Sequence, residues 1–588
     1  MRSLILLFLI FSFFSYSAEY KNEVIVLFKN GNISTESYSL KISKFQVPDG
    51  KNIKSFINEL KKREDVLYAE PNYMIKALKL PNDPDFYDKN GDPNWWWSVI
   101  NAPEAWDIST GSTTVYIAVV DTGVDYNHPD LRDNLWINTD ELLNVDRDGN
   151  GIDDGCENGD DKDGNGYVDD CYGINALCYQ YDQNGNLIFN NALSGCSTPD
   201  AYDDDGHGTH VAGIIGAVTD NTIGVAGVNW TVKIVPCKFL DSSGNGSLDG
   251  EIICLDYIKD LKEKKGINII ALNASYGGEY PASDIEKLKI SSLTDILFIS
   301  AAGNEGKNNE LINFHPCNYD LDNQLCIGAS DQLNNRASFT TSLSSNYGVS
   351  KVKMFAPGKE ILSTYINDQY VVISGTSQAA PFVTGAVGLL FSSNSSLTIS
   401  DIKYKLMFSG KNYPDKLSGY SYTCNVLNLY NLFINDTEEK LCLDRISYNF
   451  GDTAVNSTKT VKITVRNTGE VDLFISSVYT NNSNFTVSQD CTDNPIKNNN
   501  ICTITVNFTP TSTNQYSGTL FIDYGNGKSV EVSLEGNGIS QTQSGVVFPE
   551  LKGSSGCRIS SASDFGVLTA YILLIISMIL RRKIKKDG

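Results

Sequence analysis

The chain has 588 residues, with 47 Lys and Arg against 70 Asp and Glu, and a formal net charge of −23. A chain of this length exceeds a single hydrophobic core, so two or three domains are expected. The acidity would repel phosphates and argues against a nucleic acid as partner. For many of the carboxylates, a solvated acidic surface is a sufficient explanation.

The amino terminus has the pattern of an export signal. A positive start at Met1-Arg2 is followed by an apolar run over residues 4–14 and then by small residues. This predicts a signal peptide over residues 1–17, cleaved near Ser17 or Ala18. The apolar run is too short to span a membrane. Export permits disulfides, and the chain has 13 cysteines, an odd number.

Residues 19–80 form a small unit rich in Lys and Glu. A strand at 23–28 and an amphipathic helix at 53–63 predict a small α+β domain.

Residues 81–435 alternate apolar, β-branched runs with helical stretches. The runs lie at 115–120, 232–235, 267–272 and 296–299. Short apolar strands separated by helices predict a mostly parallel sheet covered on both faces, which is a three-layer, doubly wound α/β fold. Ligands of such sheets bind at the carboxyl ends of the strands.

Residues 442–540 change to short strands of alternating apolar and polar residues, as at 461–465, 502–506 and 529–534. Residues 524–527, Tyr-Gly-Asn-Gly, have the composition of a hairpin turn. The pattern predicts an all-β sandwich. It contains no catalytic constellation, so we interpret it as a spacer or binding module.

The carboxyl terminus combines a Ser- and Gly-rich stretch at 541–564, an apolar run at 565–580 and a basic tail at 581–588. These predict a flexible linker, a transmembrane or sorting helix, and a cytoplasmic end. The run and tail, preceded by Gly556-Cys557, resemble the C-terminal sorting signals of some exported bacterial proteins. A removable sorting tail and a permanent anchor both remain open, as does a soluble enzyme in which 565–580 packs as a core helix.

Three segments place a reactive group at the end of an apolar run or at the start of a helix. They carry Asp121, His207 and Ser377. A histidine can take the proton of a serine hydroxyl near neutral pH, and a buried carboxylate fixes the tautomer of that histidine. Pro381 is expected in the first turn of its helix, where an amide needs no intrahelical acceptor. Asp, His and Ser in this chain order is the order found in subtilisin.

The motifs DTGVDYNHPDL, DGHGTHVAG, AAGNEG and SGTSQAAP also occur in this order. Over residues 81–435 the chain therefore resembles the subtilisin-like (subtilase) peptidase family. The resemblance implies that Asp121 orients the base, His207 is the general base, and Ser377 is the nucleophile. It assigns Asn304 and the backbone amide of Ser377 to the oxyanion hole. Gln378 departs from the family, which usually carries Met there, but this neighbour performs no chemistry.

The same resemblance implies that two edge segments hold the substrate peptide as an added strand. They are Gly244, Asn245 and Gly246, and Ser275, Tyr276 and Gly277. Nothing in the sequence resembles an acidic pocket for basic side chains, so we expect a broad preference for apolar or aromatic residues.

An acidic insert at 140–200 contains a tandem repeat. Its oxygen-bearing positions are Asp146, Asp148, Asn150 and Asp154 in the first copy, and Asp161, Asp163, Asn165 and Asp169 in the second. Alternating oxygen ligands with glycine at the turn suit Ca²⁺. Flanking helices are not evident, so these are predicted calcium loops and not EF-hands. A disordered acidic loop is the alternative.

The family resemblance implies a further structural calcium site. Its ligands would be Asp130, Asn221, the carbonyls of Thr219, Ile223 and Val225, and, more weakly, Asp83.

Connectivity of the cysteines does not follow from the sequence. Pairing neighbours along the chain gives 156–171, 178–196, 237–254, 317–326, 424–442 and 491–502, and leaves Cys557 over.

Together these features predict a secreted, calcium-stabilised serine endopeptidase of broad specificity that hydrolyses proteins through an acyl-enzyme. It would be made as a zymogen whose domain 19–80 acts as chaperone and inhibitor until it is removed near residue 80. We expect a monomer, attached to a membrane by its tail. The rival interpretation is a non-catalytic surface adhesin on the same scaffold, against which the complete set of Asp121, His207, Asn304 and Ser377 argues.

Overall fold

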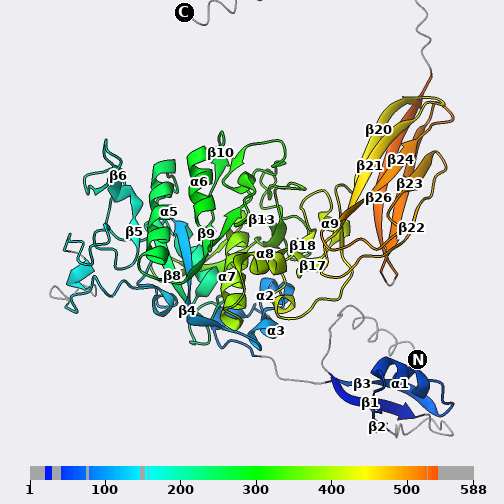
Figure 1. Cartoon of the computed structure of the whole chain (residues 1–588), viewed down its shortest axis with the longest axis horizontal. Coiled ribbons are helices and arrows are strands. Elements are labelled where there is room, and N and C mark those ends of the chain that lie inside the picture. The colour runs from blue at the N-terminus through cyan, green and yellow to red at the C-terminus, as the bar shows by residue number, and fades with distance from the viewer. Residues whose placement is uncertain are drawn as a thin grey trace, which may run out of the picture. The chain divides into compact units, whose positions relative to one another are not determined.

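The computed structural model describes residues 20–28, 42–48, 50–73, 79–145, 153–156, 158–525 and 527–540 (Figure 1). The predicted signal peptide, the linker, the apolar run at 565–580, the basic tail and Cys557 lie outside these residues. Within them, no helix has the length and apolar character that a membrane crossing requires.

The amino-terminal unit is a three-stranded antiparallel sheet with one helix. The strand order is β2 (Ile42–Gln46), β1 (Tyr20–Phe28) and β3 (Val66–Tyr73). Helix α1 (Ile53–Leu60) starts at Asn52, whose side chain accepts from the backbone amides of Lys54 and Ser55. Ile53, Ile57 and Leu60, spaced for one helix face, join the buried cluster of the sheet. The small α+β unit forms as predicted.

The centre of the chain is a nine-stranded sheet, parallel except for the pair β17–β18. Its order is β17 (Lys411–Asn412), β18 (Asn425–Val426), β14 (Met354–Pro357), β13 (Gln324–Ser330), β11 (Leu297–Ala301), β9 (Ile269–Ala274), β4 (Gly111–Asp121), β8 (Thr231–Lys238) and β5 (Ile174–Asn175).

Helices cover both faces of this sheet. One face packs against α4 (His207–Gly216), α7 (Thr376–Ser393) and α8 (Ile399–Phe408), and the other against α5 (Leu248–Glu263) and α6 (Asp284–Ser292). Along β4, Ile117 and Val119 enter the first core, whereas Ala118 and Val120 enter the second. A strand buried on both faces needs a continuous apolar run, which explains the sequence signal. The predicted doubly wound fold is confirmed.

Shorter elements complete this region. They are α2 (Trp95–Val99), α3 (Ala102–Trp106), α9 (Pro414–Leu417), and the antiparallel pairs β6 (Tyr179–Tyr181) with β7 (Leu187–Phe189), β10 (Gly278–Glu279) with β12 (Phe314–His315), and β15 (Ile361–Tyr365) with β16 (Gln369–Ile373).

The carboxyl-terminal region consists of two four-stranded sheets enclosing one apolar core, as predicted for a sandwich. The first sheet is β19 (Leu441–Leu443), β21 (Lys459–Asn467), β24 (Ile501–Phe508) and β23 (Phe485–Gln489). The second is β20 (Ser447–Ala454), β26 (Lys528–Ile539), β25 (Gln515–Tyr524) and β22 (Ile475–Thr480). Strands β25 and β26 pair antiparallel from Tyr524 opposite Lys528, which confirms the predicted hairpin.

All six pairings of neighbouring cysteines are present as disulfides. They span 9 to 18 residues of sequence. Cross-links of this number are typical of proteins in oxidising, extracellular compartments.

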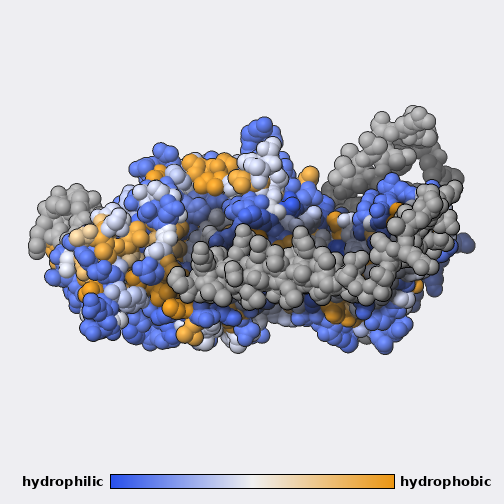
Figure 2. Space-filling model, turned by 90° about the horizontal axis from the view of Figure 1, so that it is seen from above, coloured by the Kyte–Doolittle hydropathy of each residue, from blue (hydrophilic) through white to orange (hydrophobic). Residues whose placement is uncertain are grey.

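Hydrophilic residues predominate on the face shown in Figure 2, with apolar patches among them. Several carboxylates are nevertheless buried, namely Asp83, Asp121, Asp125, Asp130, Glu141, Asp169, Asp170, Asp200, Asp203, Glu251, Glu286 and Asp436. A buried carboxylate is unfavourable unless hydrogen bonds, a cation or a proton compensates it, so each group needs a physical explanation.

Candidate active site

A cavity of about 300 Å³ opens beside the ends of the central strands. Its lining combines most of the predicted catalytic and substrate-binding residues. The lining residues are Thr122, Asp205, His207, Leu240, Gly244, Ser275, Tyr276, Gly277, Ala301, Gly303, Asn304, Glu305, Phe314, Thr376 and Ser377. Residues separated by 170 positions in sequence, such as His207 and Ser377, thus share one cavity wall.

The acid and base of the predicted triad are in direct contact. Asp121 is the last residue of β4 and is fully buried. Its Oδ1 lies 2.8 Å from His207 Nδ1 and also accepts from the backbone amide of Thr122. His207 is the first residue of α4 and follows Gly206, whose φ of 110° is left-handed. A Cβ at Gly206 would also collide with the ring of Tyr365, so the turn into α4 requires glycine.

Carboxylates determine the proton affinity of His207. Burial alone would lower its pKa, but the contact with Asp121 and the charges of Asp205 and Asp203 raise that pKa to about 9. A bond from a carboxylate to Nδ1 fixes the imidazole tautomer and leaves Nε2 to exchange protons.

The predicted nucleophile exchanges hydrogen bonds with Ser275. Ser377 is the second residue of α7, and its hydroxyl donates to the carbonyl of Ser275 at 3.0 Å. In return, the hydroxyl of Ser275 donates to the carbonyl of Ser377 at 2.8 Å. The Ser377 hydroxyl therefore points to Ser275 in this conformation, and it must rotate to reach His207. Such contacts are often completed only when substrate is bound.

The expectation that Pro381 lies in the first helical turn is wrong. Helix α7 begins at Thr376, so Pro381 is inside it, where its missing N–H deprives the carbonyl of Ser377 of its intrahelical donor. The hydroxyl of Ser275 takes the place of that donor.

The side chain of Ser275 is itself held by hydrogen bonds to β9 and α7. The side-chain Nδ2 of Asn273 donates to the Ser275 hydroxyl at 2.8 Å, and the hydroxyl of Thr384, on α7, donates to the side-chain Oδ1 of Asn273 at 2.8 Å. All three side chains are buried, so this chain of hydrogen bonds connects β9 to α7 directly beneath the nucleophile. No spacing in the sequence indicates this connection.

Asn304 is oriented as a donor toward the cavity. Its Oδ1 accepts from the backbone amide and the hydroxyl of Thr376, at 2.9 and 3.0 Å. The Nδ2 group is therefore left to donate, and Asn304 lines the cavity with Ser377. The hydroxyl of Thr376 also accepts from the amide of Gly303, which ties the strand end to the start of α7.

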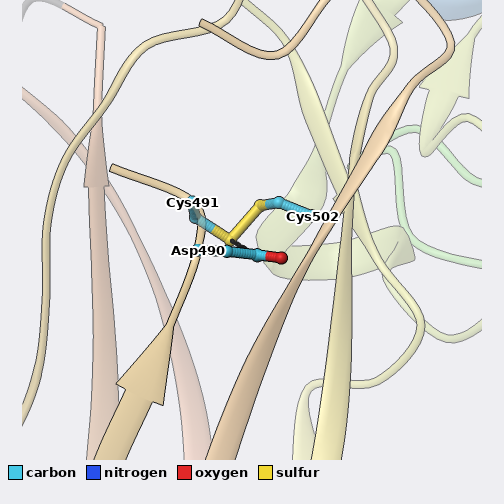
Figure 3. A group of neighbouring side chains, drawn as sticks. All are labelled: Asp490, Cys491 and Cys502. Atoms are coloured by element: carbon cyan, nitrogen blue, oxygen red, sulfur yellow. Dashed lines mark hydrogen bonds between the residues drawn. A yellow bond between two sulfur atoms is a disulfide. The ribbon is translucent and has the colours of Figure 1, made fainter. Parts of the chain in front are cut away.

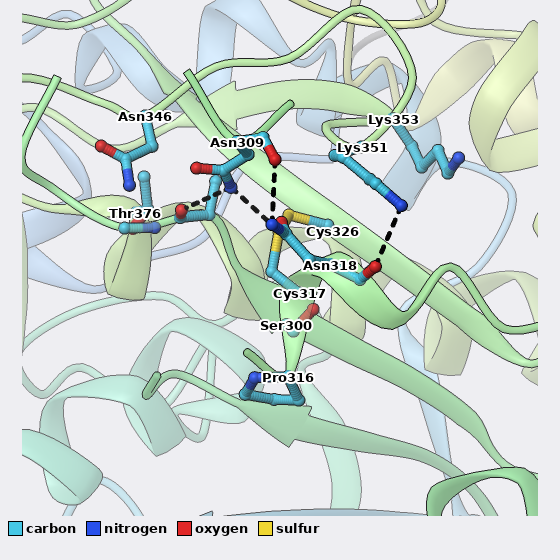
Figure 4. Close-up of a disulfide and its surroundings, with 12 residues drawn as sticks. Ser300, Asn309, Pro316, Cys317, Asn318, Cys326, Asn346, Lys351, Lys353 and Thr376 are labelled. Atoms are coloured by element: carbon cyan, nitrogen blue, oxygen red, sulfur yellow. Dashed lines mark hydrogen bonds between the residues drawn. A yellow bond between two sulfur atoms is a disulfide. The ribbon is translucent and has the colours of Figure 1, made fainter. Parts of the chain in front are cut away.

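A disulfide supports the segment behind Asn304. Figure 4 shows Asn309 and Asn318 beside the Cys317–Cys326 bridge. Asn309 donates to the carbonyl of Ala302 at 3.0 Å, and Asn318 donates to the carbonyl of Asn309 at 2.9 Å. The loop after β11 is thereby held against a cross-linked part of the fold.

The two predicted substrate-binding segments contribute unequally to the cavity. Ser275, Tyr276 and Gly277 all line it, whereas of the first segment only Gly244 does. Asn245 instead belongs to a tight turn in which its amide donates to Asp241 Oδ1 at 3.1 Å. Next to this turn, Gly246 packs closely on Phe239 and Leu240.

The predicted subtilase-type calcium residues converge in the structure. Asp130 Oδ1 accepts from Asn221 Nδ2 at 2.8 Å, and its Oδ2 accepts from the amide of Val225 at 3.0 Å. Asp83 accepts from the amides of Asp220 and Asn221. Thr219 and Ile223 belong to the same loop, in which the amide of Ile223 donates to Asn221 Oδ1.

Electrostatics at this loop favour a cation. Asp83 and Asp130 are both fully buried, and among the described residues neither forms an ion pair with a basic side chain. Burial, with the charge of Asp83 adding to it, raises the pKa of Asp130 to about 7. Two buried carboxylates joined to one loop through Asn221 supply the hard oxygen ligands that Ca²⁺ takes.

The second acidic repeat forms a compact loop, joined by a residue that the sequence did not indicate. Carboxylate oxygens of Asp161, Asp163 and Glu141 lie within 4.8 Å of one another. Asp161 and Asp163 accept from the amide of Asn165, at 3.0 and 2.9 Å. Glu141 precedes the repeat and has no place in its spacing, so only the fold reveals it.

Two features of this loop differ from the predicted set. Asp169 accepts from the amide of Gly159 and is not in the carboxylate group, whereas its neighbour Asp170 accepts from Asn165 Nδ2 at 2.9 Å. Lys265 Nζ lies 2.6 Å from Asp163 and supplies a positive charge there. The first copy, with Asp146, Asp148, Asn150 and the side chain of Asp154, is outside the described residues.

Asp490, Cys491 and Cys502 also place potential ligand atoms together (Figure 3). The two sulfurs are joined in a disulfide, so neither can act as a thiolate ligand. Asp490 accepts instead from the amide of Thr503 at 2.8 Å.

Comparison with known proteins decides the family. Residues 112–422, more than half of the chain, match the protein family described as "Subtilase family". The chain belongs to the subtilase family of subtilisin-like serine peptidases. Residues 439–537 match a "HYDIN/CFA65/VesB-like, Ig-like domain", in agreement with the sandwich.

Individual relatives cover this subtilase to different extents. "Thermophilic serine proteinase" of Bacillus sp. (strain AK1) is 32% identical over 387 residues, which is 63% of this chain and 78% of the relative. "Thermitase" of Thermoactinomyces vulgaris is 33% identical over 340 residues, 58% of this chain and 93% of the relative. "Subtilisin-like protease 1" of Plasmodium berghei (strain Anka) is 30% identical over 387 residues, 63% of this chain. The chain spans 58% of that protein, less than two thirds of its length.

Proposed function

We propose that this subtilase is a secreted, calcium-stabilised endopeptidase that cleaves proteins and peptides through an acyl-enzyme. The observation that carries the proposal is the Asp121–His207 contact of 2.8 Å in a cavity whose wall also holds Ser377 and Asn304. An adhesin on this scaffold would have no use for that arrangement.

In the proposed mechanism, Ser377 Oγ attacks the carbonyl carbon of the scissile peptide as His207 Nε2 takes its proton. Asp121 holds Nδ1 and stabilises the imidazolium. The oxygen of the tetrahedral intermediate accepts from Asn304 Nδ2 and from the backbone amide of Ser377. The C–N bond then breaks, and His207 returns the proton to the leaving amine.

Water completes the cycle. His207 removes a proton from a water molecule, which attacks the acyl carbon, and the ester bond to Ser377 breaks as the proton returns to Oγ. Hydrogen bonding of the substrate backbone along Gly244 and Ser275–Gly277 would position the peptide with little demand on its sequence.

We further propose that residues 19–80 are an inhibitory propeptide removed by self-processing near residue 80. Supporting this, the unit has its own sheet and its own buried core, and all nine strands of the central sheet come after it in the sequence.

Structural Ca²⁺ is proposed at Asp83, Asp130 and Asn221 with the carbonyls of Thr219, Ile223 and Val225. A second site is proposed at Asp161, Asp163 and Asn165, to which we add Glu141. When bound, the cation neutralises these carboxylates and fixes their loops, and it takes no part in the reaction.

For the carboxyl terminus we propose that the sandwich acts as a spacer and that residues 565–588 anchor the enzyme or serve as a sorting tail. Deletion of 565–588 should release active peptidase to the medium. Equal distribution of the full-length and truncated chains between membrane and medium would exclude an anchoring role.

The decisive test of the proposed activity is labelling with a fluorophosphonate, which reacts only with an activated serine. The wild-type chain should be labelled, and Ser377→Ala should not be, while losing on the order of 10⁶ in kcat. Ser377→Ala should also accumulate uncut precursor when expressed alone. A wild-type chain that is correctly folded but neither labelled nor able to cleave a peptide library would refute the peptidase function.

A further inference from the structure

Two glutamates meet in the interior between α5 and α6. Glu251 of α5 is 3% exposed and Glu286 of α6 is 0% exposed. Their side chains are hydrogen-bonded to each other. Among the described residues, no Lys, Arg or His forms an ion pair with either of them.

Two carboxylates cannot both be ionised in such contact without a cation, so the pair must hold a proton. The remaining bonds indicate where that proton lies. Glu286 accepts from the hydroxyls of Tyr280 and Tyr319, at 2.8 and 2.6 Å, whereas Glu251 accepts from Tyr276 alone, at 2.9 Å. Glu286, with more donors, is the better-stabilised anion, and protonated Glu251 is its third side-chain donor.

One of the three tyrosines that bind this pair, Tyr276, lines the active-site cavity, and the other two pack behind it. Tyr276 lines the cavity and follows Ser275, which exchanges hydrogen bonds with Ser377. Tyr280 and Tyr319 do not line the cavity but pack against His315, with ring centres 5.6 and 4.3 Å from that of His315. His315 follows Phe314, another cavity residue.

We propose that Glu251 and Glu286 form a proton-sharing carboxyl pair that positions the Tyr276 wall of the substrate cleft, and that loss of the shared proton at alkaline pH weakens substrate binding. Both are positioning residues, since neither lines the cavity. This inference rests on the proposed peptidase function only for its kinetic consequence.

The physical reason is the cost of a second buried charge. Deprotonation of Glu251 breaks its bond to Glu286 and sets two anions against each other in an apolar core. The titratable groups facing the pair are Tyr276, Tyr280 and Tyr319, with His315 behind them, and burial lowers the pKa of His315, so that it supplies no cation at alkaline pH. The repulsion between the two ionised glutamates can therefore be reduced only by movement of α5, α6 and Tyr276.

The kinetic test compares KM across pH for the wild type, Glu251→Gln and Asp249→Asn with a peptide substrate that has no titrating group. Glutamine at 251 keeps a donor for Glu286 and an acceptor for Tyr276 but has no proton to lose. Wild-type KM should rise at alkaline pH, by at most about tenfold per pH unit as the competent fraction falls. KM of Glu251→Gln should stay level while kcat follows the wild type. Asp249 is an exposed acid on the same helix, so Asp249→Asn should behave like the wild type.

A second measurement requires no activity. In a Ser377→Ala background, the melting temperature should fall as pH rises above the ordinary glutamate pKa of 4.5, because the folded pair keeps a proton that the unfolded chain has lost. Glu251→Gln should make this slope shallower by the contribution of one proton, while the other buried carboxyls with raised pKa values, such as Asp130, keep theirs. Glu286→Gln should be the more destabilising of the two, because an amide has one oxygen for the two phenols of Tyr280 and Tyr319.

The outcomes separate the two hypotheses. Slopes of melting temperature that are identical in the wild type and Glu251→Gln would overturn the proton-sharing pair whatever the enzyme does. A slope made shallower by Glu251→Gln, together with parallel KM profiles, would overturn the link to the cleft and leave the peptidase function untouched.

Discussion

The exchange of hydrogen bonds between Ser275 and Ser377 predicts that Ser275 and Pro381 are energetically coupled. Ser275→Ala removes the 2.8 Å donor to the carbonyl of Ser377, which Pro381 cannot replace because it has no N–H. It also removes the acceptor of Asn273 Nδ2. Pro381→Ala restores an intrahelical donor for the Ser377 carbonyl but does nothing for Asn273.

The magnitude follows from these bonds. Each lost bond that leaves a group unsatisfied costs about 1 kcal/mol or more, so Ser275→Ala should destabilise by about 2–3 kcal/mol when Pro381 is present. In the Pro381→Ala background the carbonyl of Ser377 is satisfied, and the cost of Ser275→Ala should fall by about 1 kcal/mol. That difference is the coupling energy of the double-mutant cycle.

Urea unfolding of the four variants in a Ser377→Ala background, which prevents autolysis, measures this energy. Ser393→Ala on the same helix is the matched control, because its hydroxyl contacts only its own turn, at the carbonyl of Leu390. A Ser275→Ala cost that is the same with and without the Pro381→Ala substitution would refute the compensation.

Three further predictions test the site. Asn304→Asp keeps the acceptor for Thr376 and loses the donor, so kcat should fall by about 10²–10³, the loss known for one such donor in a subtilisin, with little change in melting temperature; undiminished kcat would remove Asn304 from the oxyanion hole. Calcium at about 100 times its Kd should stabilise by about 2.7 kcal/mol per site, and Asp130→Asn should reduce the effect of a chelator on melting temperature to what the second site contributes, so a variant as sensitive to chelator as the wild type would contradict the Asp130 site. The charge of Asp205 raises the pKa of His207, so Asp205→Asn should move the acidic limb of the pH profile of kcat/KM to lower pH. An acidic limb at the same pH in both proteins would show that the charge of Asp205 does not affect the pKa of His207.

The positions of Asp121, His207 and Ser377 were predictable because each lies in a local motif at the end of a buried strand or the start of a helix. Asp121 follows an apolar run that can only be a strand buried on both faces, and its position at the carboxyl end follows from that. Pairing each cysteine with its neighbour, as in Cys317–Cys326, gave the right disulfides although the sequence does not determine connectivity, because closing a short loop needs little from the rest of the fold.

What could not be predicted depends on contacts between distant segments. Ser275 and Ser377 are 102 positions apart. Nothing in either motif indicates that the Ser275 hydroxyl replaces the N–H donor that Pro381 cannot give to the carbonyl of Ser377. Glu141 joins the acidic repeat from outside its spacing, 22 residues before Asp163. Glu251 sits on a helix whose sequence is that of an ordinary amphipathic surface helix, and only packing against α6 makes it a buried acid.

Three groups of buried acids in this strongly acidic chain are compensated in different ways, and the kind of compensation determines what each group responds to. Asp121 is compensated by an imidazole, so its neighbourhood responds to the state of the reaction. Asp83 and Asp130 lack any basic partner among the described residues, so a metal ion is the compensation that their oxygens suit, and their loop should respond to chelation. Glu251 and Glu286 compensate each other with a proton, so they should respond to pH alone. Because the three groups lie on different elements, Glu251→Gln should leave the response to chelator and the labelling of Ser377 unchanged at a fixed pH, and measuring both in that variant tests whether the compensations are separate.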